Sequence, residues 1–139
     1  MINAAGRGLV VFVILCSGLG CRLGGRNPGR GVPEPQVEHV VVFWLKQPGN
    51  GDARRRIIHA SEAFRAIRGV LRVDAGPMLP SPRGNVDRTF DVAVVMLFEN
   101  RQALEDYQSH PRHAAMLAEL GPLVERTVAY DFAPQRDRN

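Results

Sequence analysis

The chain has 139 residues, the length of one ordinary domain, with 18 Lys and Arg against 14 Asp and Glu and a net charge of +4. Residues 1–36 hold four arginines and one glutamate, a net of +3, which leaves only +1 for the rest of the chain. Because the arginines of that remainder alternate with carboxylates, we expect no basic face and no nucleic-acid partner. Both cysteines, Cys16 and Cys21, lie near the start, so disulfides, thiol catalysis and cysteine-based zinc sites are excluded for the remainder.

Residues 1–21 have the pattern of a signal peptide for export. Arg7 precedes an uninterrupted apolar run at residues 9–15, and small residues follow before Cys21. The run is too short for a permanent membrane-spanning helix, which needs about 20 apolar residues. The pattern therefore predicts a leader that is recognised for export and then removed.

Residues 18–21, Gly-Leu-Gly-Cys, resemble a bacterial lipobox, in which the cysteine is acylated and becomes the mature N-terminus. The motif departs from the usual one because Gly18 occupies a position where leucine is common. The resemblance implies an exported, membrane-anchored lipoprotein that faces the periplasm or the cell exterior, with lipidation at Cys21. It implies membrane contact only through that lipid anchor, and secretion without acylation is the alternative.

Residues 22–36 are rich in Gly, Pro and Arg and show no apolar periodicity, which is typical of a tether. The first regular element is then a strand at residues 37–46, where β-branched and aromatic residues dominate. Asp52 is expected to cap a helix that extends to about Arg68, and Gly69 ends it. A second strand follows at residues 70–78, before a loop that contains several Pro and Gly residues.

The C-terminal half is predicted to form a strand, two consecutive helices, a last strand and a disordered tail, at residues 89–99, 100–109, 111–120, 126–132 and 134–139. Asn100 is a good helix cap, and Pro111 separates the two helices because proline breaks the first and is favoured at the start of the second. The element order predicts an α+β fold of the ferredoxin-like, split βαβ plan. In that plan a four-stranded antiparallel sheet has helices on one face.

The apolar residues on both faces of the predicted strands indicate that a second subunit covers the sheet. In the first strand, His39 and Phe43 lie on one face, and Val40, Val42 and Trp44 lie on the other, so both faces are largely apolar. The helices can cover only one face, and a sheet face left in water is normally polar. We therefore expect a homodimer that packs through the open face carrying Val40, Val42 and Trp44.

The segment from Tyr107 to His113, Tyr-Gln-Ser-His-Pro-Arg-His, places a phenol and two imidazoles around the helix break. His113 falls in the first turn of the second helix, where the helix dipole disfavours a cation and favours a neutral, proton-accepting imidazole. A tyrosine beside a neutral histidine can serve acid–base chemistry, although a packed core pair has the same pattern. His110 and His113 by themselves make an incomplete metal site, so no metal is predicted. His110 is expected to be a helix-junction residue, and His59 a surface residue.

Residues 37–133 resemble the stress-responsive A/B barrel (Dabb) domain family. The resemblance is carried by an ordered set of segments: Glu38-His39-Val40-Val41-Val42-Phe43, Arg68-Gly69-Val70, Ala75-Gly76, Phe90-Asp91-Val92-Ala93-Val94, Leu104 to His113, and Val128-Ala129-Tyr130-Asp131. It implies a ferredoxin-like subunit that dimerises into an α+β barrel. It does not imply a single activity.

In a plant branch of this family, which cyclises linear polyketides without a cofactor, the matching residues act in one pocket. The resemblance therefore marks His113 and Tyr107 as catalytic or ligand-binding residues, with His39 in the same pocket, and implies no cofactor. His113 would accept a proton next to a carbonyl, and the Tyr107 hydroxyl would hydrogen-bond the enolate oxygen. The sequence leaves a small-molecule-binding module and a cofactor-independent cyclase or lyase open, and a purely structural polar network is the third alternative.

Overall fold

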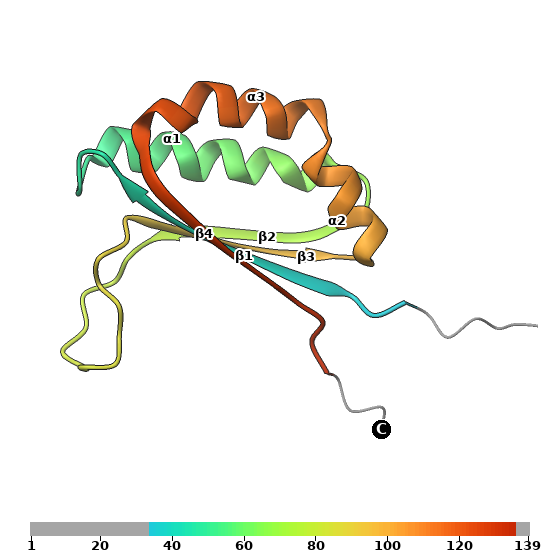
Figure 1. Ribbon diagram of the computed structural model, residues 1–139, viewed down its shortest axis with the longest axis horizontal. Coiled ribbons are helices and arrows are strands. Elements are labelled where there is room, and N and C mark those ends of the chain that lie inside the picture. Colours follow the sequence, from blue (N-terminus) through green and yellow to red (C-terminus); the bar gives the residue numbers. More distant parts are fainter. Residues whose placement is uncertain (1–33, 136–139) are drawn as a thin grey trace, which may run out of the picture. The chain divides into compact units, whose positions relative to one another are not determined.

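The structure is a computed structural model that describes residues 34–135 of the chain (Figure 1). The predicted signal peptide, the predicted lipidation residue Cys21, most of the predicted tether and residues 136–139 of the predicted tail lie outside the described residues. Residues 34–36 have no regular secondary structure and lead directly into the first strand. Within residues 34–135, none of the helices has both the length and the apolar character needed to cross a membrane.

Four strands form one antiparallel sheet with the spatial order β2-β3-β1-β4. The strands are β1 (Val37–Leu45), β2 (Val70–Pro77), β3 (Val92–Phe98) and β4 (Val124–Phe132). β1 and β3 are central, while β2 and β4 are the edges. This order places the first and last strands of the domain side by side, so residues about 90 positions apart in sequence meet across β1 and β4.

The helices all lie on one face of the sheet (Figure 1). They are α1 (Gly51–Glu62), α2 (Arg101–Gln108) and α3 (Pro111–Leu120), with 3-10 turns at η1 (Ala63–Ala66) and η2 (Gly121–Leu123). α1 packs against β2 and β3, and α3 packs against α1 and α2. The predicted α+β, ferredoxin-like architecture is confirmed.

The first helix differs from its prediction at both ends. Its N-cap is Asn50 and not Asp52, because the Asn50 side chain accepts hydrogen bonds from the backbone N–H groups of Asp52 and Ala53. The α-helical hydrogen bonding ends at Glu62, and the chain continues as the tighter turn η1. A 3-10 turn has about three residues per turn. It therefore keeps Phe64 and the residue three positions later, Ile67, on the buried side.

The third strand begins at Val92, three residues later than predicted. The residue before it, Asp91, binds the turn after β1 through its side chain. The buried Asp91 carboxylate accepts hydrogen bonds from the backbone N–H groups of Leu45 (2.9 Å) and Gly49 (2.7 Å), which fixes the turn after β1. The alternation of β3 therefore does not extend back to Phe90. Its ring lies against Trp44, 6.5 Å between centroids, on the face opposite the helices and not with Val92.

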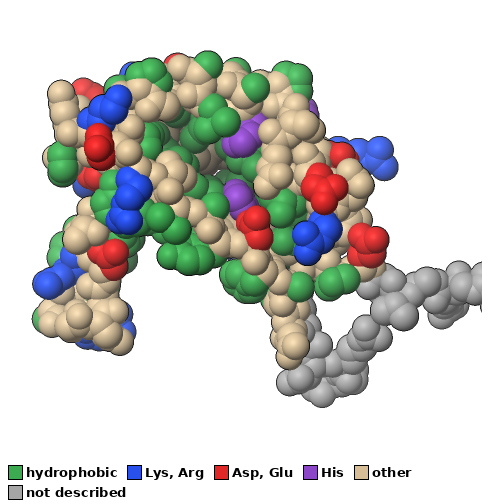
Figure 2. Space-filling model, viewed as in Figure 1, with side chains coloured by type: hydrophobic (Ala, Val, Ile, Leu, Met, Phe, Trp, Pro, Cys, Tyr) green, Lys and Arg blue, Asp and Glu red, His purple; other side chains and the backbone are tan. Residues whose placement is uncertain are grey.

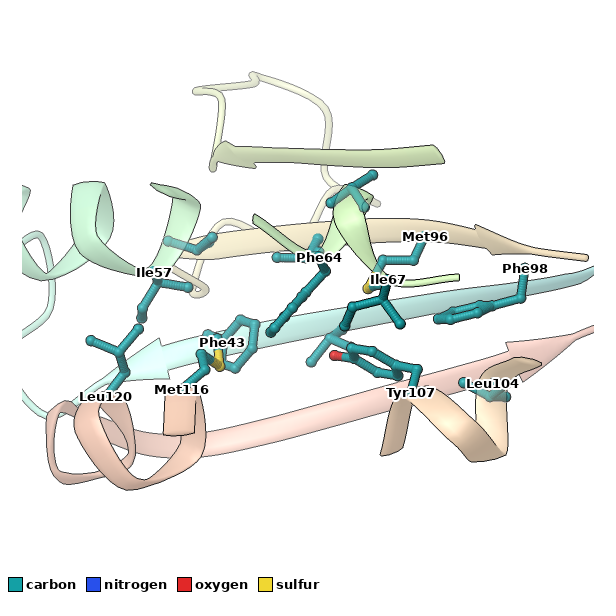
Figure 3. Close-up of a cluster of buried hydrophobic side chains, with 14 of the residues drawn as sticks. Phe43, Ile57, Phe64, Ile67, Met96, Phe98, Leu104, Tyr107, Met116 and Leu120 are labelled. Carbon is teal, nitrogen blue, oxygen red and sulfur yellow. The ribbon is translucent and has the colours of Figure 1, made fainter. Parts of the chain in front are cut away.

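The core lies between the helices and the sheet face that they cover (Figure 3). In β1 every odd-numbered residue is buried and every even-numbered one is half-buried, as the sequence alternation predicted. The largest core side chains come from all layers: Phe43, Ile57, Phe64, Met96, Phe98, Leu104, Tyr107, Met116 and Leu120. Tyr107, His39 and Ser61 are buried side chains with a polar group on this side of the sheet, and all three line the candidate site.

Candidate functional site

Strand β1 places His39 on the helix-covered face, where its side chain is buried with 7% exposure. The β1–β4 register sets His39 directly opposite Asp131, and both residues point to the same face of the sheet. His39 Nδ1 lies 2.5 Å from the Asp131 carboxylate oxygen Oδ1. Because a carboxylate only accepts, the imidazole donates from Nδ1.

Helix α2 places Tyr107 over the same part of the sheet. The helix is capped by Asn100, whose side chain accepts from the Ala103 N–H at 2.9 Å. The Tyr107 ring is 4% exposed and packs edge-on against Phe64, with centroids 5.1 Å apart. Burial raises the pKa of the Tyr107 phenol well above its usual range, because the phenolate would lose its hydration. Tyr107 is therefore a neutral hydrogen-bond donor and not a base under ordinary conditions.

The helix junction places His113 beside Tyr107. Pro111 is the first residue of α3, and the His110 ring caps the helix by accepting from the Arg112 N–H at 3.1 Å. His113 follows in the first turn, and its ring lies 4.6 Å from the Tyr107 ring between centroids. His113 Nδ1 lies 3.0 Å from the Gln108 carbonyl oxygen, one of the carbonyls left unpaired where α2 ends.

The partners of the two histidines determine where their protons lie. His113 Nδ1 faces a carbonyl oxygen and His39 Nδ1 faces a carboxylate, so both rings donate from Nδ1. In the neutral imidazole the other nitrogen, Nε2, is then an acceptor. Two proton-accepting nitrogens and the Tyr107 hydroxyl therefore belong to one small region, and His39 lies 6.0 Å from Tyr107 between ring centroids.

These three side chains line one cavity of about 280 Å³ between the helices and the sheet. Figure 2 shows it as a hollow with histidine side chains on two of its sides. Its remaining polar lining comes from Ser61, Gln108 and Thr127. The rest of the lining is apolar and includes Val41, Phe43, Phe64, Val94, Met96 and Met116. The volume lies near the lower end of the range for small-molecule pockets.

The cavity opens along strand β4, which the helices leave uncovered. Thr127, Ala129 and Asp131 are the β4 residues on the helix side, since they pair with the buried residues Phe43, Val41 and His39. All three are nevertheless exposed, whereas the corresponding positions of β3 are buried. The site is thus a cleft between α3 and the β4 edge, with walls that are mostly hydrocarbon.

The structure brings together His39, Tyr107 and His113, the three candidate residues from the sequence, and separates the remaining histidines from them. His110 lines a different hollow, next to Gly69 and the start of α2, and His59 is exposed on α1. The predicted positions of both residues, at the helix junction and on the surface, are confirmed. Across residues 34–135, no group of three or more His, Cys, Asp or Glu side chains could hold a metal ion.

Sequence reasoning assigned no role to Asp131, the partner of His39. Asp131 shares one face of β4 with the polar residues Glu125 and Thr127, and only the pairing of β1 with β4 brings it to His39. The alternation of side chains along the last strand could have suggested which face of the sheet carries Asp131. It could not have shown which residue of β1 lies opposite Asp131.

A comparison with protein-family models matches residues 37–134 to the stress responsive A/B barrel domain, Dabb. The chain belongs to the Dabb family. The match spans every strand and helix that the structure describes, so the cleft lies entirely within the Dabb domain. No curated protein matches the sequence.

Solved structures agree with this assignment. A Dabb family protein with a ferredoxin-like fold from Mesorhizobium loti is 28% identical, with a TM-score of 0.60 over 74% of this chain and 100% of the other. A dimeric ferredoxin-like protein of unknown function from Thermobifida fusca is 27% identical, with a TM-score of 0.62 over 73% of this chain and 92% of the other. The hydroxynitrile lyase from Passiflora edulis is 18% identical, with a TM-score of 0.64 over 77% of this chain and 99% of the other, a likeness of fold alone.

Proposed function

We propose that this Dabb protein is an exported small-molecule-binding module and that the cleft between α3 and β4 is its binding site. The observation that carries the proposal is the cavity of about 280 Å³ whose mostly apolar wall is interrupted by His39, Tyr107 and His113. A concave apolar surface with a few converging polar groups is the usual form of a ligand site. A filled polar core would leave no such space.

The polar groups suit a ligand with a carbonyl or phenolic oxygen. The buried Tyr107 hydroxyl donates to a carbonyl oxygen, because its raised pKa keeps the proton in place. The Nε2 atoms of His39 and His113 accept from a hydroxyl, because their Nδ1 protons are engaged with Asp131 and Gln108. One oxygen-bearing group can therefore find both donor and acceptor partners in the cleft.

Acid–base catalysis is the second candidate function, and the pairing of His39 with Asp131 favours it. A carboxylate at 2.5 Å orients the imidazole and stabilises the cation that forms when Nε2 takes a proton. A proton next to a carbonyl could then pass to His39 or His113 while Tyr107 hydrogen-bonds the enolate oxygen. This would make the protein a cofactor-independent cyclase or lyase that acts on a small carbonyl or polyketide-like substrate. The Dabb fold alone does not decide between binding and turnover.

The proposal is tested by measuring the binding of small phenols and ketones to the wild type and to His113→Ala. We expect affinity to fall by about tenfold or more, since a buried hydrogen bond to the ligand is lost. The unfolding temperatures should differ little, and His59→Ala, which removes an exposed histidine, should bind like the wild type. If His113→Ala unfolds far more easily and no phenol or ketone binds either protein, then His113 is a core residue and the proposal fails.

Catalysis requires a further result. Cyclisation or proton exchange next to a carbonyl should occur with the wild type and be lost in both His113→Ala and Tyr107→Phe. Tyr107→Phe keeps the ring that packs against Phe64 and removes only the hydroxyl, so its fold should persist. Binding without any turnover would leave the protein as a binding module.

We also propose that the protein is a homodimer that packs through the sheet face opposite the helices. This open face carries Val40, Val42 and Val128 at its centre and two exposed aromatic residues, Tyr130 (59% exposed) and Phe132 (51%), at the end of β4. A contiguous apolar face of this kind indicates a partner surface. The dimeric character of the Thermobifida fusca protein supports the same arrangement.

Polar groups at one end of the open face support the proposal because they resemble the rim of an interface. Arg72 bridges Glu38 at 3.2 Å and Asp74 at 3.0 Å. At the other end, the connection between β2 and β3 extends below the sheet (Figure 1). Together with Ala93 and Val95 it lines a hollow of about 570 Å³. A second subunit would fill this hollow and bury the apolar centre.

The dimer is tested by Val42→Asp, which would bury an unpaired charge at the interface at a cost of several kcal/mol, on the order of 3–5. Sedimentation at micromolar concentration should then show monomer or unfolded chain. The control is Ala118→Asp, which places the same charge on the exposed outer side of α3 and should leave the dimer intact. A Val42→Asp protein that sediments as the wild-type dimer would disprove the assigned face.

Export and lipidation complete the proposed function and rest on the sequence of residues 1–21. Intact-mass measurement of protein from the membrane fraction should show a chain that begins at Cys21 and carries acyl groups. Cys21→Ser should lose the acyl mass and leave the membrane fraction, while Cys16→Ser should change neither. A soluble mature chain that begins elsewhere without acyl mass would show simple secretion instead.

A further inference from the structure

The cleft continues beyond the histidines into a second cavity of about 280 Å³. The two cavities share the lining residues Phe43, Met116, Leu117 and Thr127, so they are neighbours along the gap between α3 and β4. The second cavity is otherwise lined by Ile57, Leu120 and Val124, together with Gly121, Glu125 and Arg126. Apolar side chains therefore make up most of its lining, and Glu125, Arg126 and Thr127 are its polar members.

The charges around both cavities disfavour an anionic ligand. Among the described residues, Arg126 is the only Lys or Arg that lines either cavity. Its guanidinium lies 3.6 Å from the centre of the Trp44 ring, and Trp44 belongs to the opposite face of the sheet. Two acidic residues, in contrast, lie at the cleft. Glu125 lines the second cavity, and the Asp131 carboxylate accepts a hydrogen bond from His39. A carboxylate or phosphate in the cleft would face these negative charges with no lysine or arginine to compensate.

We propose that the cleft binds a neutral amphiphile whose carbonyl or phenolic end lies among His39, Tyr107 and His113 and whose apolar tail extends into the second cavity. This inference rests on the proposed binding function and names its ligand class. The polar end occupies the part of the cleft with hydrogen-bonding groups. The tail occupies the part lined by Ile57, Leu120 and Val124, where removing hydrocarbon from water is the main gain.

The positions of the two cavities determine how a ligand lies in the cleft. Both cavities are lined in part by exposed residues of β4, and Leu117, which is 52% exposed, lines both of them. The ligand therefore lies lengthwise along the edge of the sheet and need not pass through the core. An extended molecule with one polar end meets this shape better than a compact polar one.

The test is a series of 4-alkylphenols, from methyl to octyl, titrated into the full chain at about pH 8, where a phenol is neutral and a carboxylic acid is ionised. Affinity should rise about fourfold with each added methylene until the second cavity is full, and then level off. Straight-chain carboxylates of matching length should bind about tenfold more weakly or worse, because their charge has no partner. Equal or tighter binding of the carboxylates would overturn the inference.

A substitution locates the tail. Val124→Phe places a ring in the second cavity from a half-buried strand position, and the ratio of octyl to methyl affinity should then drop by about tenfold or more. The control is Leu71→Phe, a similar enlargement at a residue of β2 that is 47% exposed and lines neither cavity, which should leave this ratio at the wild-type value. Both variants retain the apolar leader, so binding to the leader would not distinguish them.

The outcomes separate this inference from the proposed function. If short phenols bind through His113 but longer tails add nothing, the ligand class is wrong and the binding site stands. If longer tails add affinity equally in Val124→Phe, the tail lies elsewhere and the inference is wrong. If no phenol or ketone binds at all, both proposals fail.

Discussion

Replacing Gly69 by alanine should destabilise the domain far more than the same replacement at Gly49. Both glycines have positive backbone angles, with φ of 84° at Gly69 and 79° at Gly49, so an alanine at either position costs about 1–2 kcal/mol of backbone strain. The two positions differ in their surroundings. A Cβ atom at Gly69 would lie 2.6 Å from the Cβ of Ala103 on α2, whereas a Cβ at Gly49 would meet nothing within 4 Å.

The contact with Ala103 adds the cost of overpacking, about 1–3 kcal/mol, because neither atom belongs to a flexible side chain that could move aside. We therefore expect Gly69→Ala to lower the free energy of unfolding by about 2–5 kcal/mol and Gly49→Ala by about 1–2 kcal/mol. The Gly69 contact also sets the position of α2, which carries Tyr107 one helical turn after Ala103. Gly69→Ala should consequently weaken ligand binding in the cleft as well.

Urea unfolding at one fixed protein concentration measures these costs, since the stability of a dimer depends on concentration. The double variant Gly69→Ala with Ala103→Gly removes the contact but keeps the backbone strain, so it should recover the overpacking part of the loss after allowance for the helix cost of Ala103→Gly alone. Equal losses for Gly69→Ala and Gly49→Ala, or no recovery in the double variant, would refute the assigned contact.

Three further predictions concern single side chains. His110→Ala should lower the free energy of unfolding by about 1 kcal/mol because α3 loses its cap, while His110→Asn, which can also accept from the helix, should lose much less, as measured by urea unfolding. Asp91→Ala should cost about 2–4 kcal/mol in the same assay, since it leaves two backbone N–H groups without their acceptor; a loss below that of His110→Ala would contradict the role given to Asp91. Because burial raises the pKa of Tyr107, its contribution to stability is complete below about pH 10 and is lost above, where the unfolded chain releases the proton first. Urea midpoints should therefore fall more steeply above about pH 10 in the wild type than in Tyr107→Phe, and parallel curves would show that the phenol is not buried.

The sequence by itself determined the features that depend on neighbouring residues. Alternation in β1 is a property of the extended backbone, so His39 could be assigned to the helix-covered face from its parity with Phe43. The break at Pro111 and the cap at Asn100 follow from local backbone chemistry, and both were predicted correctly. Local rules also showed their limit at α1, where Asp52 was predicted as the cap and the capping hydrogen bonds are made to Asn50 instead.

Tertiary structure decided what depends on how distant segments meet. The register of β1 with β4 brings Asp131 to His39 across 92 positions, and no local pattern specifies that pairing. The Asp91 side chain accepts hydrogen bonds from the turn after β1, so β3 begins only at the next residue, later than predicted. The Phe90 ring before it lies on the face opposite the helices. The cleft itself exists because the helices cover three strands and leave the β4 edge open. Sequence periodicity marks which residues are apolar, but the space between them is set by the placement of whole elements against one another.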